Sequence, residues 1–262
     1  MNLNLTGKTA LVCGASQGLG AAVAHELALL GANVVVLSRN GDKLATVTAG
    51  LPDNGSQHHS YIIADTSKPD DVKHAVGAYL AAGNTIHILV NNTGGPPAGP
   101  LLSTPAVELE TAFRSHLITS HNLAQFVVDG MKKAGYGRIV NIVSTSVKQP
   151  INGLGISNTV RAAVANWAKT LANELGGFGI TVNNVLPGFT NTNRLGYLFA
   201  KQAENGHTTV DDILQRTITQ IPAARLGEPE EFGAAVAFLC SPAASYINGI
   251  NLPVDGGRLG GL

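Results

Sequence analysis

Short runs of apolar, mostly β-branched residues alternate along this chain with longer segments of helical apolar spacing. Runs such as TALVCG (9–14) and NVVVLS (33–38) would be apolar on both faces of a strand. Such strands need cover on both sides, which a parallel sheet joined by helices provides. Right-handed crossovers then give a doubly wound, Rossmann-type α/β fold. The pattern predicts seven parallel strands, at 9–14, 33–38, 60–65, 86–92, 137–144, 180–187 and 249–257, and helices on both faces, at 19–31, 41–50, 69–82, 105–134, 156–176, 193–221 and 228–240.

Composition excludes several classes of protein. Without an internal repeat or a Pro/Ser-rich linker, the 262 residues predict a single domain over 1–262. Lys plus Arg and Asp plus Glu both number 17, so no net charge attracts nucleic acid or an anionic membrane. Cys13 and Cys240 lack metal-ligand spacing, and we expect no metal. No secretory signal or membrane-spanning run is present, so we expect a soluble, cytoplasmic protein.

A glycine-rich turn, GASQGLG (14–20), follows the first predicted strand and enters a helix. Gly14, Gly18 and Gly20 allow a tight turn in which backbone N–H groups approach a pyrophosphate at the helix N-terminus. The GxxxGxG spacing differs from the GxGxxG of many dinucleotide folds. By itself, such a turn is equally compatible with a plain strand-to-helix connection.

Two further charges lie where a dinucleotide's adenosine half would bind. The second predicted strand ends in SRN (38–40), and Arg39 there favours a 2′-phosphate, hence NADP over NAD. The alternative is a solvated loop arginine. Asp65 ends the third predicted strand and can accept an adenine amino hydrogen, or serve only as a turn residue.

Five motifs in order, CGASQGLG (13–20), NNTG (91–94), GRIVNIVS (137–144), PGFTNT (187–192) and SYINGINLPVDGG (245–257), resemble the short-chain dehydrogenase/reductase family. Within it, the likeness is to bacterial 3-oxoacyl-acyl-carrier-protein reductases, and it covers nearly the whole chain. The resemblance implies a bound nicotinamide nucleotide, a small-molecule carbonyl or alcohol substrate, a homotetramer, and a mobile substrate lid at 193–221. Together with the turn and Arg39, it places the cofactor contacts at Gly14, Ser16, Gln17, Gly18, Leu19, Gly20, Ser38, Arg39, Asp65, Thr66, Asn91, Gly94, Arg161, Pro187, Gly188, Thr190 and Thr192.

The resemblance also fixes four catalytic positions, where this family uses Asn, Ser, Tyr and Lys. Ser144 matches the family's serine, which polarises the carbonyl. The tyrosine and lysine positions, 13 residues later and four beyond, are Ser157 and Arg161. His116 occupies the asparagine position. By this alignment, three of the four catalytic residues are changed.

These changes alter the expected proton path. A serine hydroxyl ionises far less readily than a tyrosine, and arginine does not deprotonate in proteins. Because an unperturbed histidine titrates near neutrality, we predict that His116 supplies the proton, through water and Ser157. The alternatives are a core histidine bonded to a backbone carbonyl and a Ser157 that caps the helix N-terminus. Tyr197 is the one tyrosine that could swing toward the nicotinamide, and the sequence offers no clear substitute.

Two functions remain open. The first is an NADP(H)-dependent oxidoreductase that interconverts a carbonyl and an alcohol with a non-standard proton donor. The second is a nucleotide-binding protein with little or no redox turnover, acting as a sensor or a partner subunit. Halohydrin dehalogenases of this family also have Arg for Lys, but they keep the tyrosine and lose the glycines, the reverse of this chain. The predicted lid shows no arginine cluster that would mark a phosphate or carboxylate, so the substrate is not predicted.

Overall fold

The computed structural model describes residues 1–261 and contains one seven-stranded parallel sheet. Its strand order is β3-β2-β1-β4-β5-β6-β7. The chain winds outward from β1 in one direction and then from β4 in the other, so the direction reverses between these two strands. Ligands of doubly wound sheets bind at this reversal, beyond the carboxyl ends of the strands. The strands are β1 (Thr9–Cys13), β2 (Asn33–Ser38), β3 (Ser60–Ile63), β4 (Ile88–Asn91), β5 (Gly137–Ile142), β6 (Ile180–Pro187) and β7 (Asn251–Val254).

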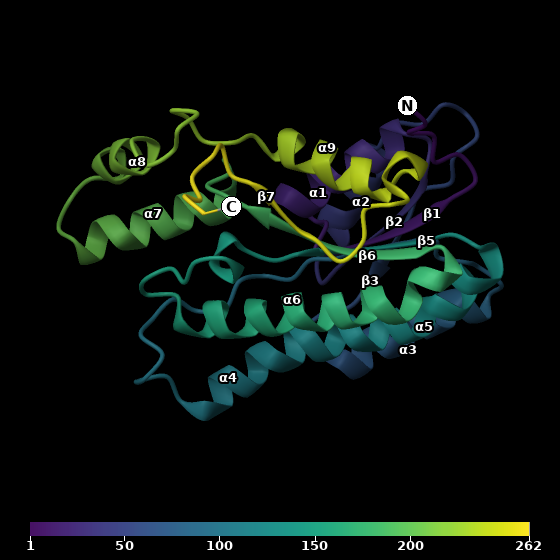
Figure 1. Cartoon of the computed structure of the whole chain (residues 1–262), viewed down its shortest axis with the longest axis horizontal. Helices are drawn as coiled ribbons and strands as arrows, with labels where there is room; N and C mark the ends of the chain where they lie inside the picture. The colour runs from purple at the N-terminus through teal and green to yellow at the C-terminus, as the bar shows by residue number, and fades with distance from the viewer. Residues whose placement is uncertain (262) are drawn as a thin grey trace.

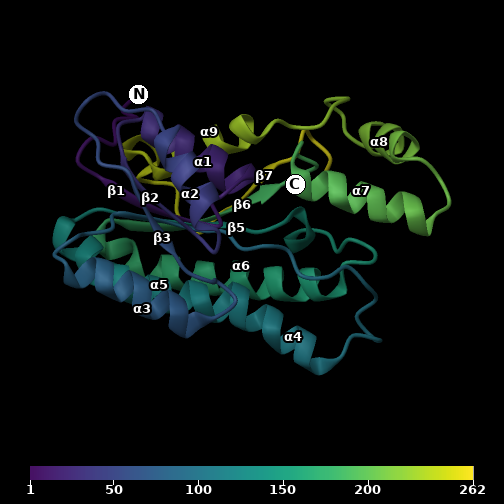
Figure 2. The same ribbon diagram turned by 180° about the vertical axis from the view of Figure 1, so that it is seen from behind.

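Helices cover both faces of the sheet, which confirms the predicted fold class (Figures 1 and 2). On one face lie α1 (Gly18–Leu29), α2 (Gly41–Ala49) and α9 (Pro229–Cys240); on the other lie α3 (Pro69–Ala81), α4 (Ala106–Phe113), α5 (Thr119–Ala134) and α6 (Gly155–Leu175). Neighbouring strand residues enter opposite cores: Val12 packs with α1 and α9 residues, and Leu11 with residues of α3, α5 and α6. Both faces of the inner strands β1, β2, β4, β5 and β6 are therefore buried, whereas the edge strands β3 and β7 are partly exposed.

The helix predicted over 105–134 is interrupted by one π-helical turn. Between α4 and α5, residues Arg114–Ile118 form this turn, η1. The Thr119 hydroxyl donates to the Arg114 carbonyl at 3.1 Å and to the Thr66 carbonyl at 2.9 Å. A π turn inserts one extra residue and is frequent at functional sites. Here it carries His116.

The segment predicted as a lid forms two helices, α7 (Asn193–Asn205) and α8 (Val210–Ile218). They extend past the carboxyl end of the sheet (Figures 1 and 2). Leu195, Phe199 and Ile213 form a small core of their own, separate from the two sheet cores. The side chains of Thr192 and Thr209 cap the two helix N-termini.

A ladder of four asparagines crosses the sheet from β4 to β7. Each Nδ2 donates to the Oδ1 of the next residue in register, from Asn91 to Asn141, Asn184 and Asn251, at 2.8, 2.9 and 2.8 Å. Three members are almost fully buried, and the hydrogen bonds satisfy most of their polar atoms. The ladder joins the carboxyl ends of β4 and β5 to the middle of β6 and the first residue of β7.

Among the described residues, no helix is both long and apolar enough to cross a membrane.

Candidate active site

The glycine turn adopts the tight conformation that the sequence predicts. Gly14 and Gly18 both have a φ of +60°, where a side chain is strained. A Cβ on Gly20 would lie 2.4 Å from the Gly14 carbonyl oxygen, so a larger residue cannot fit. The N-cap residue Gln17 makes no capping bond, because its Oε1 accepts from Lys43 Nζ at 3.0 Å. The first N–H groups of α1 therefore lack a side-chain partner, as anion binding requires.

Arg39 lies just past β2, and its side chain is 76% exposed. Its guanidinium is 3.9 Å from Asp65, a loose ion pair. The Asp65 carboxylate accepts hydrogen bonds from the Ser67 N–H and hydroxyl at 2.9 and 2.8 Å. Burial favours protonation of Asp65, but these bonds and Arg39 outweigh it and hold the pKa below its usual value. Arg39 is thus a cation with most of its donors free at the end of β2.

Asn91 and Asn92 make different contacts, although the sequence assigns a cofactor contact to Asn91 alone. The Asn91 side chain lies in the asparagine ladder and is nearly buried, so any support of the adenosine is exerted through the strand. Asn92 instead donates from Nδ2 to the Gly14 carbonyl at 3.1 Å. A Cβ on Gly14 would be 2.7 Å from the Asn92 carbonyl oxygen. Sequence reasoning missed Asn92, although it stands in the same NNTG motif.

Ser144 lies directly beyond β5, with its side chain half-buried. It begins the short 3-10 turn Thr145–Val147, and its Oγ accepts the Ser146 N–H at 3.1 Å. Since Oγ acts here as an acceptor, its own hydrogen remains available for donation. This suits a hydroxyl that polarises a carbonyl oxygen.

Arg161 reaches the same end of β5 from α6. Its side chain is buried, with 9% exposed, and Nη1 donates to the Ile142 carbonyl at 2.7 Å. Its buried Nε has no hydrogen-bond partner, and none of the ion pairs between residues 1–261 includes Arg161. Burial, and then the charge of Arg194, lower the pKa of Arg161 to about 10, so it stays a cation at neutral pH. A buried cation with an unused donor is suited to a polar ligand.

Ser157 is half-buried one helical turn before Arg161 on α6. The alternative that it caps the helix is wrong, because α6 begins at Gly155 and its N-cap residue is Leu154. The Thr159 hydroxyl donates to the Gly155 carbonyl at 3.0 Å, whereas the Ser157 hydroxyl has no partner among the described residues. Ser157 is therefore free to bond a ligand or water.

His116 lies in the π turn and is 3% exposed. Its Nδ1 shares a hydrogen bond with the Thr93 hydroxyl. Burial, and then the positive charge of Arg161, lower its pKa to about 2, and a hydrogen bond with the Gly94 backbone opposes this only in part. The expectation that His116 titrates near neutrality is therefore wrong: desolvation and a neighbouring cation keep the imidazole neutral. The alternative of a buried histidine bonded within the fold describes it better.

The loop after β6 forms the opposite wall. A Cβ on Gly188 would be 2.6 Å from Asp255 Cα, so only glycine allows β6 and the chain after β7 to approach so closely. Thr192 Oγ1 accepts the Leu195 N–H at 3.3 Å and caps α7. A Cβ on Gly18 would lie 3.7 Å from the Thr192 methyl group. The glycine turn and the start of the lid therefore face each other.

Arg194, near the start of α7, connects the lid to the loop after β4. Its Nη2 donates to the Pro96 carbonyl at 3.3 Å, and its guanidinium lies 5.7 Å from the centre of the Tyr197 ring. Arg194 is also the charge that lowers the pKa of Arg161. The lid itself contains no arginine cluster, as its sequence indicates, and Arg161 comes from a helix far away in sequence. The exposed Tyr197 packs beside Arg194 on the lid.

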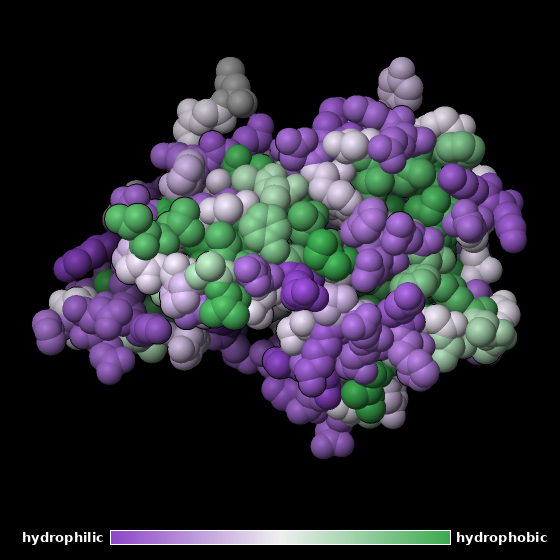
Figure 3. All heavy atoms as spheres, turned by 90° about the horizontal axis from the view of Figure 1, so that it is seen from below, coloured by the Kyte–Doolittle hydropathy of each residue, from purple (hydrophilic) through white to green (hydrophobic). Residues whose placement is uncertain are grey.

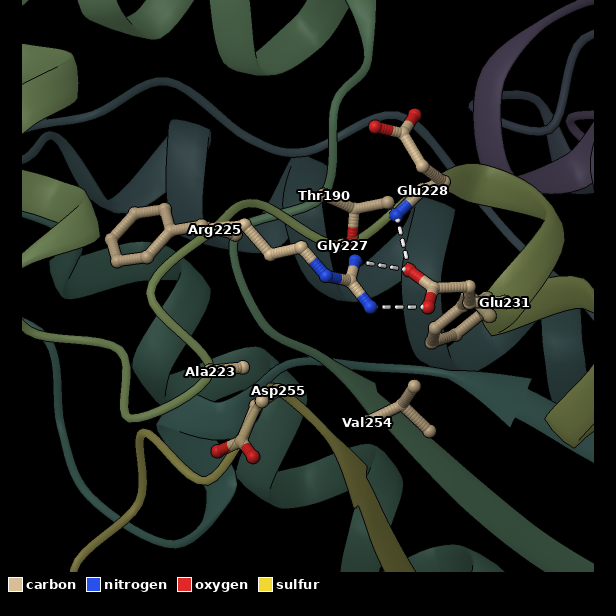
Figure 4. A pocket seen from close by; sticks show the side chains of 11 residues that line it. Thr190, Ala223, Arg225, Gly227, Glu228, Glu231, Val254 and Asp255 are labelled. Atoms are coloured by element: carbon tan, nitrogen blue, oxygen red, sulfur yellow. Dashed lines mark hydrogen bonds and ion pairs between the residues drawn. The ribbon is translucent and has the colours of Figure 1, made fainter.

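A pocket of about 120 Å³ lies beside the lid, between the loop after β6, the segment before α9 and the end of β7 (Figure 4). Arg225 forms a two-pronged ion pair with Glu231 across it, at 2.7 and 2.6 Å. Thr190 lines the pocket and bridges to Gly227. The ion pair joins the segment between the lid and α9 to the first turn of α9. Sequence reasoning did not predict this pocket, and it contains none of the four candidate catalytic side chains.

No group of three or more His, Cys, Asp or Glu side chains within residues 1–261 is arranged to hold a metal ion.

Comparison with known proteins identifies the family of this chain. Residues 14–258 match the family described as enoyl-(acyl carrier protein) reductase. Over 257 residues the chain is 34% identical to 3-oxoacyl-[acyl-carrier-protein] reductase FabG of Vibrio cholerae, covering 97% of this chain and 98% of that protein. L-sorbose reductase of Gluconobacter frateurii, solved with NADPH and L-sorbose, superposes with a TM-score of 0.93 at 28% identity over 100% of both chains. YwfH, an NADPH-dependent reductase involved in bacilysin biosynthesis, superposes with a TM-score of 0.90 at 28% identity, covering 97% of this chain and 99% of that chain. The chain therefore belongs to the short-chain dehydrogenase/reductase family.

Proposed function

We propose that this protein is an NADPH-dependent oxidoreductase that interconverts a small-molecule carbonyl and alcohol without the usual tyrosine–lysine pair. The observation that carries the proposal is the buried Arg161, which has an unpartnered Nε at the end of β5. A fold leaves a buried polar donor unsatisfied only at an energetic cost of about 1–3 kcal/mol. A bound ribose hydroxyl at this position would remove that cost.

The residues around the strand ends suit NADP. The tight glycine turn and the free N–H groups of α1 would hold the pyrophosphate. The loosely paired Arg39 would hold the 2′-phosphate, which NAD lacks. Two structural relatives, L-sorbose reductase and YwfH, are described with NADPH. When bound, the nicotinamide supplies or accepts the hydride.

The side chains at the end of β5 would orient the substrate. Ser144 has a hydroxyl hydrogen to donate to the carbonyl oxygen. Ser157 has an unengaged hydroxyl one helical turn before Arg161. Two hydroxyl donors favour the alkoxide character that develops on the oxygen in the transition state.

The proton reaches the substrate oxygen from water through the Ser157 hydroxyl. Arg161 remains a cation and does not relay protons, and His116 remains neutral because it is buried beside that cation. His116 is a positioning residue, which holds Thr93 and the loop after β4. This replaces the histidine donor that the sequence alone suggested. Without a tyrosine we expect slow turnover.

The test is NADPH oxidation by the purified protein over a panel of ketones, ketoses and oxo acids. We expect measurable turnover of at least one carbonyl, preference for NADPH over NADH, and a loss of tenfold or more in Ser144→Ala. Tight NADPH binding with no turnover across the panel would overturn the proposal. It would instead favour the alternative, a nucleotide-binding sensor or partner subunit.

We further propose a cytoplasmic homotetramer whose subunits each form one domain with 193–221 as a movable lid. Two exposed apolar side chains support an assembly of subunits: Val107 on α4 is 65% exposed, and Ile118 on η1 is 41% exposed. Figure 3, which views this side of the molecule, shows apolar surface between polar groups. Light scattering after size-exclusion chromatography measures the assembly, and a monomer would contradict the proposal.

A further inference from the structure

Two arginines lie beyond the carboxyl ends of neighbouring strands: Arg161 from α6 contacts the end of β5, and Arg194 from the lid contacts the loop after β4. The buried Arg161 is fixed to the Ile142 carbonyl, and Arg194 lies near enough to lower its pKa. No acidic side chain is among the groups that shift the pKa of Arg161 or His116. None of the ion pairs between residues 1–261 includes either arginine. The catalytic end is therefore positively charged without an internal counter-charge.

Arg194 retains donors for a ligand. A guanidinium has five N–H donors in a planar fork, and that of Arg194 contacts the Pro96 carbonyl and the Tyr197 ring face. It is exposed, so its other N–H groups meet solvent. The fork matches the two oxygens of a carboxylate.

The position of Arg194 separates it from the phosphate-binding turn. It packs against the loop after β4, where a Cβ on Gly95 would be 3.3 Å from its Nη2. The glycine turn is approached instead by Thr192, the residue just before the lid, beside Gly18. Arg194 therefore lies beside the loop after β4, the same loop whose Thr93 contacts His116.

We propose that the substrate carries a carboxylate in addition to the reacting carbonyl, and that Arg194 binds this carboxylate when the lid closes. Arg161 contributes long-range attraction while it holds the ribose. This inference rests on the proposed function, because it assigns the substrate class of the same site. It makes the substrate an oxo acid or hydroxy acid.

The experiment uses matched pairs of acids and carboxamides: 2-oxobutanoate, 4-oxopentanoate and 4-oxocyclohexanecarboxylate with their amides. Binding to the NADPH-loaded protein is measured by calorimetry, and NADPH oxidation is measured in parallel. We expect at least one acid to bind tenfold or more tightly than its amide. Arg194→Gln should abolish that preference, and Arg194→Lys should retain part of it. Arg216→Gln, at an exposed arginine of the same lid, is the matched control and should preserve it.

The outcomes separate this inference from the function on which it rests. Absence of a preference in every pair, including failure of every acid to bind, overturns it. Loss of NADPH affinity in Arg194→Gln with the acid preference intact also overturns it, since Arg194 would then serve the cofactor phosphates. Acid-selective binding without NADPH oxidation supports the inference and counts against redox turnover. NADPH oxidation with neutral ketones alone supports redox turnover and counts against the inference.

Discussion

Arg161 Nη1 donates to the Ile142 carbonyl at 2.7 Å. The bond holds this buried cation at the end of β5, because Ile142 is two residues before Ser144. This bond connects α6 to the end of β5 and determines the electrostatics around it. The neighbouring His116 is kept neutral, partly by that charge. Four predictions follow from this cation, the glycine turn and Arg39.

Replacing His116 by Asn should change how stability depends on pH. The pKa of His116 is about 2 in the folded protein and about 6.5 when unfolded, so below pH 6.5 the unfolded state binds the extra proton. Stability therefore falls as the pH drops through this window. Between pH 7 and 5, the free energy of unfolding of the wild type should fall by about 2 kcal/mol more than that of His116→Asn. Urea unfolding at both pH values measures this.

The lowered pKa of His87 affects both proteins equally and cancels in the comparison. Equal pH dependence in the two proteins would mean that the pKa of His116 is the same in the folded and the unfolded protein.

Introducing the tyrosine and lysine that our proposed alignment expects at positions 157 and 161 should accelerate hydride transfer if proton donation limits it. In Ser157→Tyr/Arg161→Lys, the phenol replaces a hydroxyl of much higher pKa and sits one turn from a cation. We expect kcat for NADPH oxidation to rise by about tenfold or more. The control Ser157→Phe/Arg161→Lys has the same bulk without the hydroxyl and should show no gain. If both double variants behave alike, proton donation is not the limiting step.

Arg39→Gln should weaken NADPH binding without affecting NADH. The side chain is mostly exposed and loosely paired, so its loss disturbs little of the fold. Charge-assisted bonds of about 1.5–3 kcal/mol predict a Kd for NADPH about 10- to 100-fold higher. Titration of each nucleotide by fluorescence measures the two affinities. Lys43→Gln, which removes another exposed cation near the turn, should have a smaller effect.

Gly20→Ala should destabilise the protein and abolish nucleotide binding, because its Cβ would lie 2.4 Å from the Gly14 carbonyl oxygen. Gly77→Ala, within α3, is the matched control. No neighbouring atom lies within 4 Å of a Cβ placed on Gly77, and alanine favours a helix. The Gly77→Ala substitution should therefore raise the free energy of unfolding by about 0.5–1 kcal/mol. Thermal unfolding with and without NADPH compares them. A Gly20→Ala protein that binds NADPH normally would contradict this packing.

The strands and the glycine turn were predictable because their signals are local. The inner strands of the sheet are apolar on two faces, as in NVVVLS, and a covered parallel sheet buries both. The spacing of Gly14, Gly18 and Gly20 is read directly from consecutive residues. The place of Arg39 at the end of β2 follows from the strand boundary.

The electrostatics of the site were not predictable because they depend on distant contacts. The pKa of His116 is determined by burial and by Arg161, which is 45 residues away in sequence. No residue pattern marks the π turn Arg114–Ile118 inside its helix. The proximity of Arg194 and Arg161 depends on how the lid folds back over the strand ends. The ladder of Asn91, Asn141, Asn184 and Asn251 similarly requires the register of four strands.

That ladder has a mechanical consequence for the cleft. It connects β4, which leads into Asn92 and Thr93, with β7, which leads into Asp255 below the lid. The hydrogen bonds tie these strands together independently of the helices above them. The helices α7 and α8 lie outside the ladder and pack around a small core of their own. The lid that we propose would therefore move over a base that is cross-linked from β4 to β7.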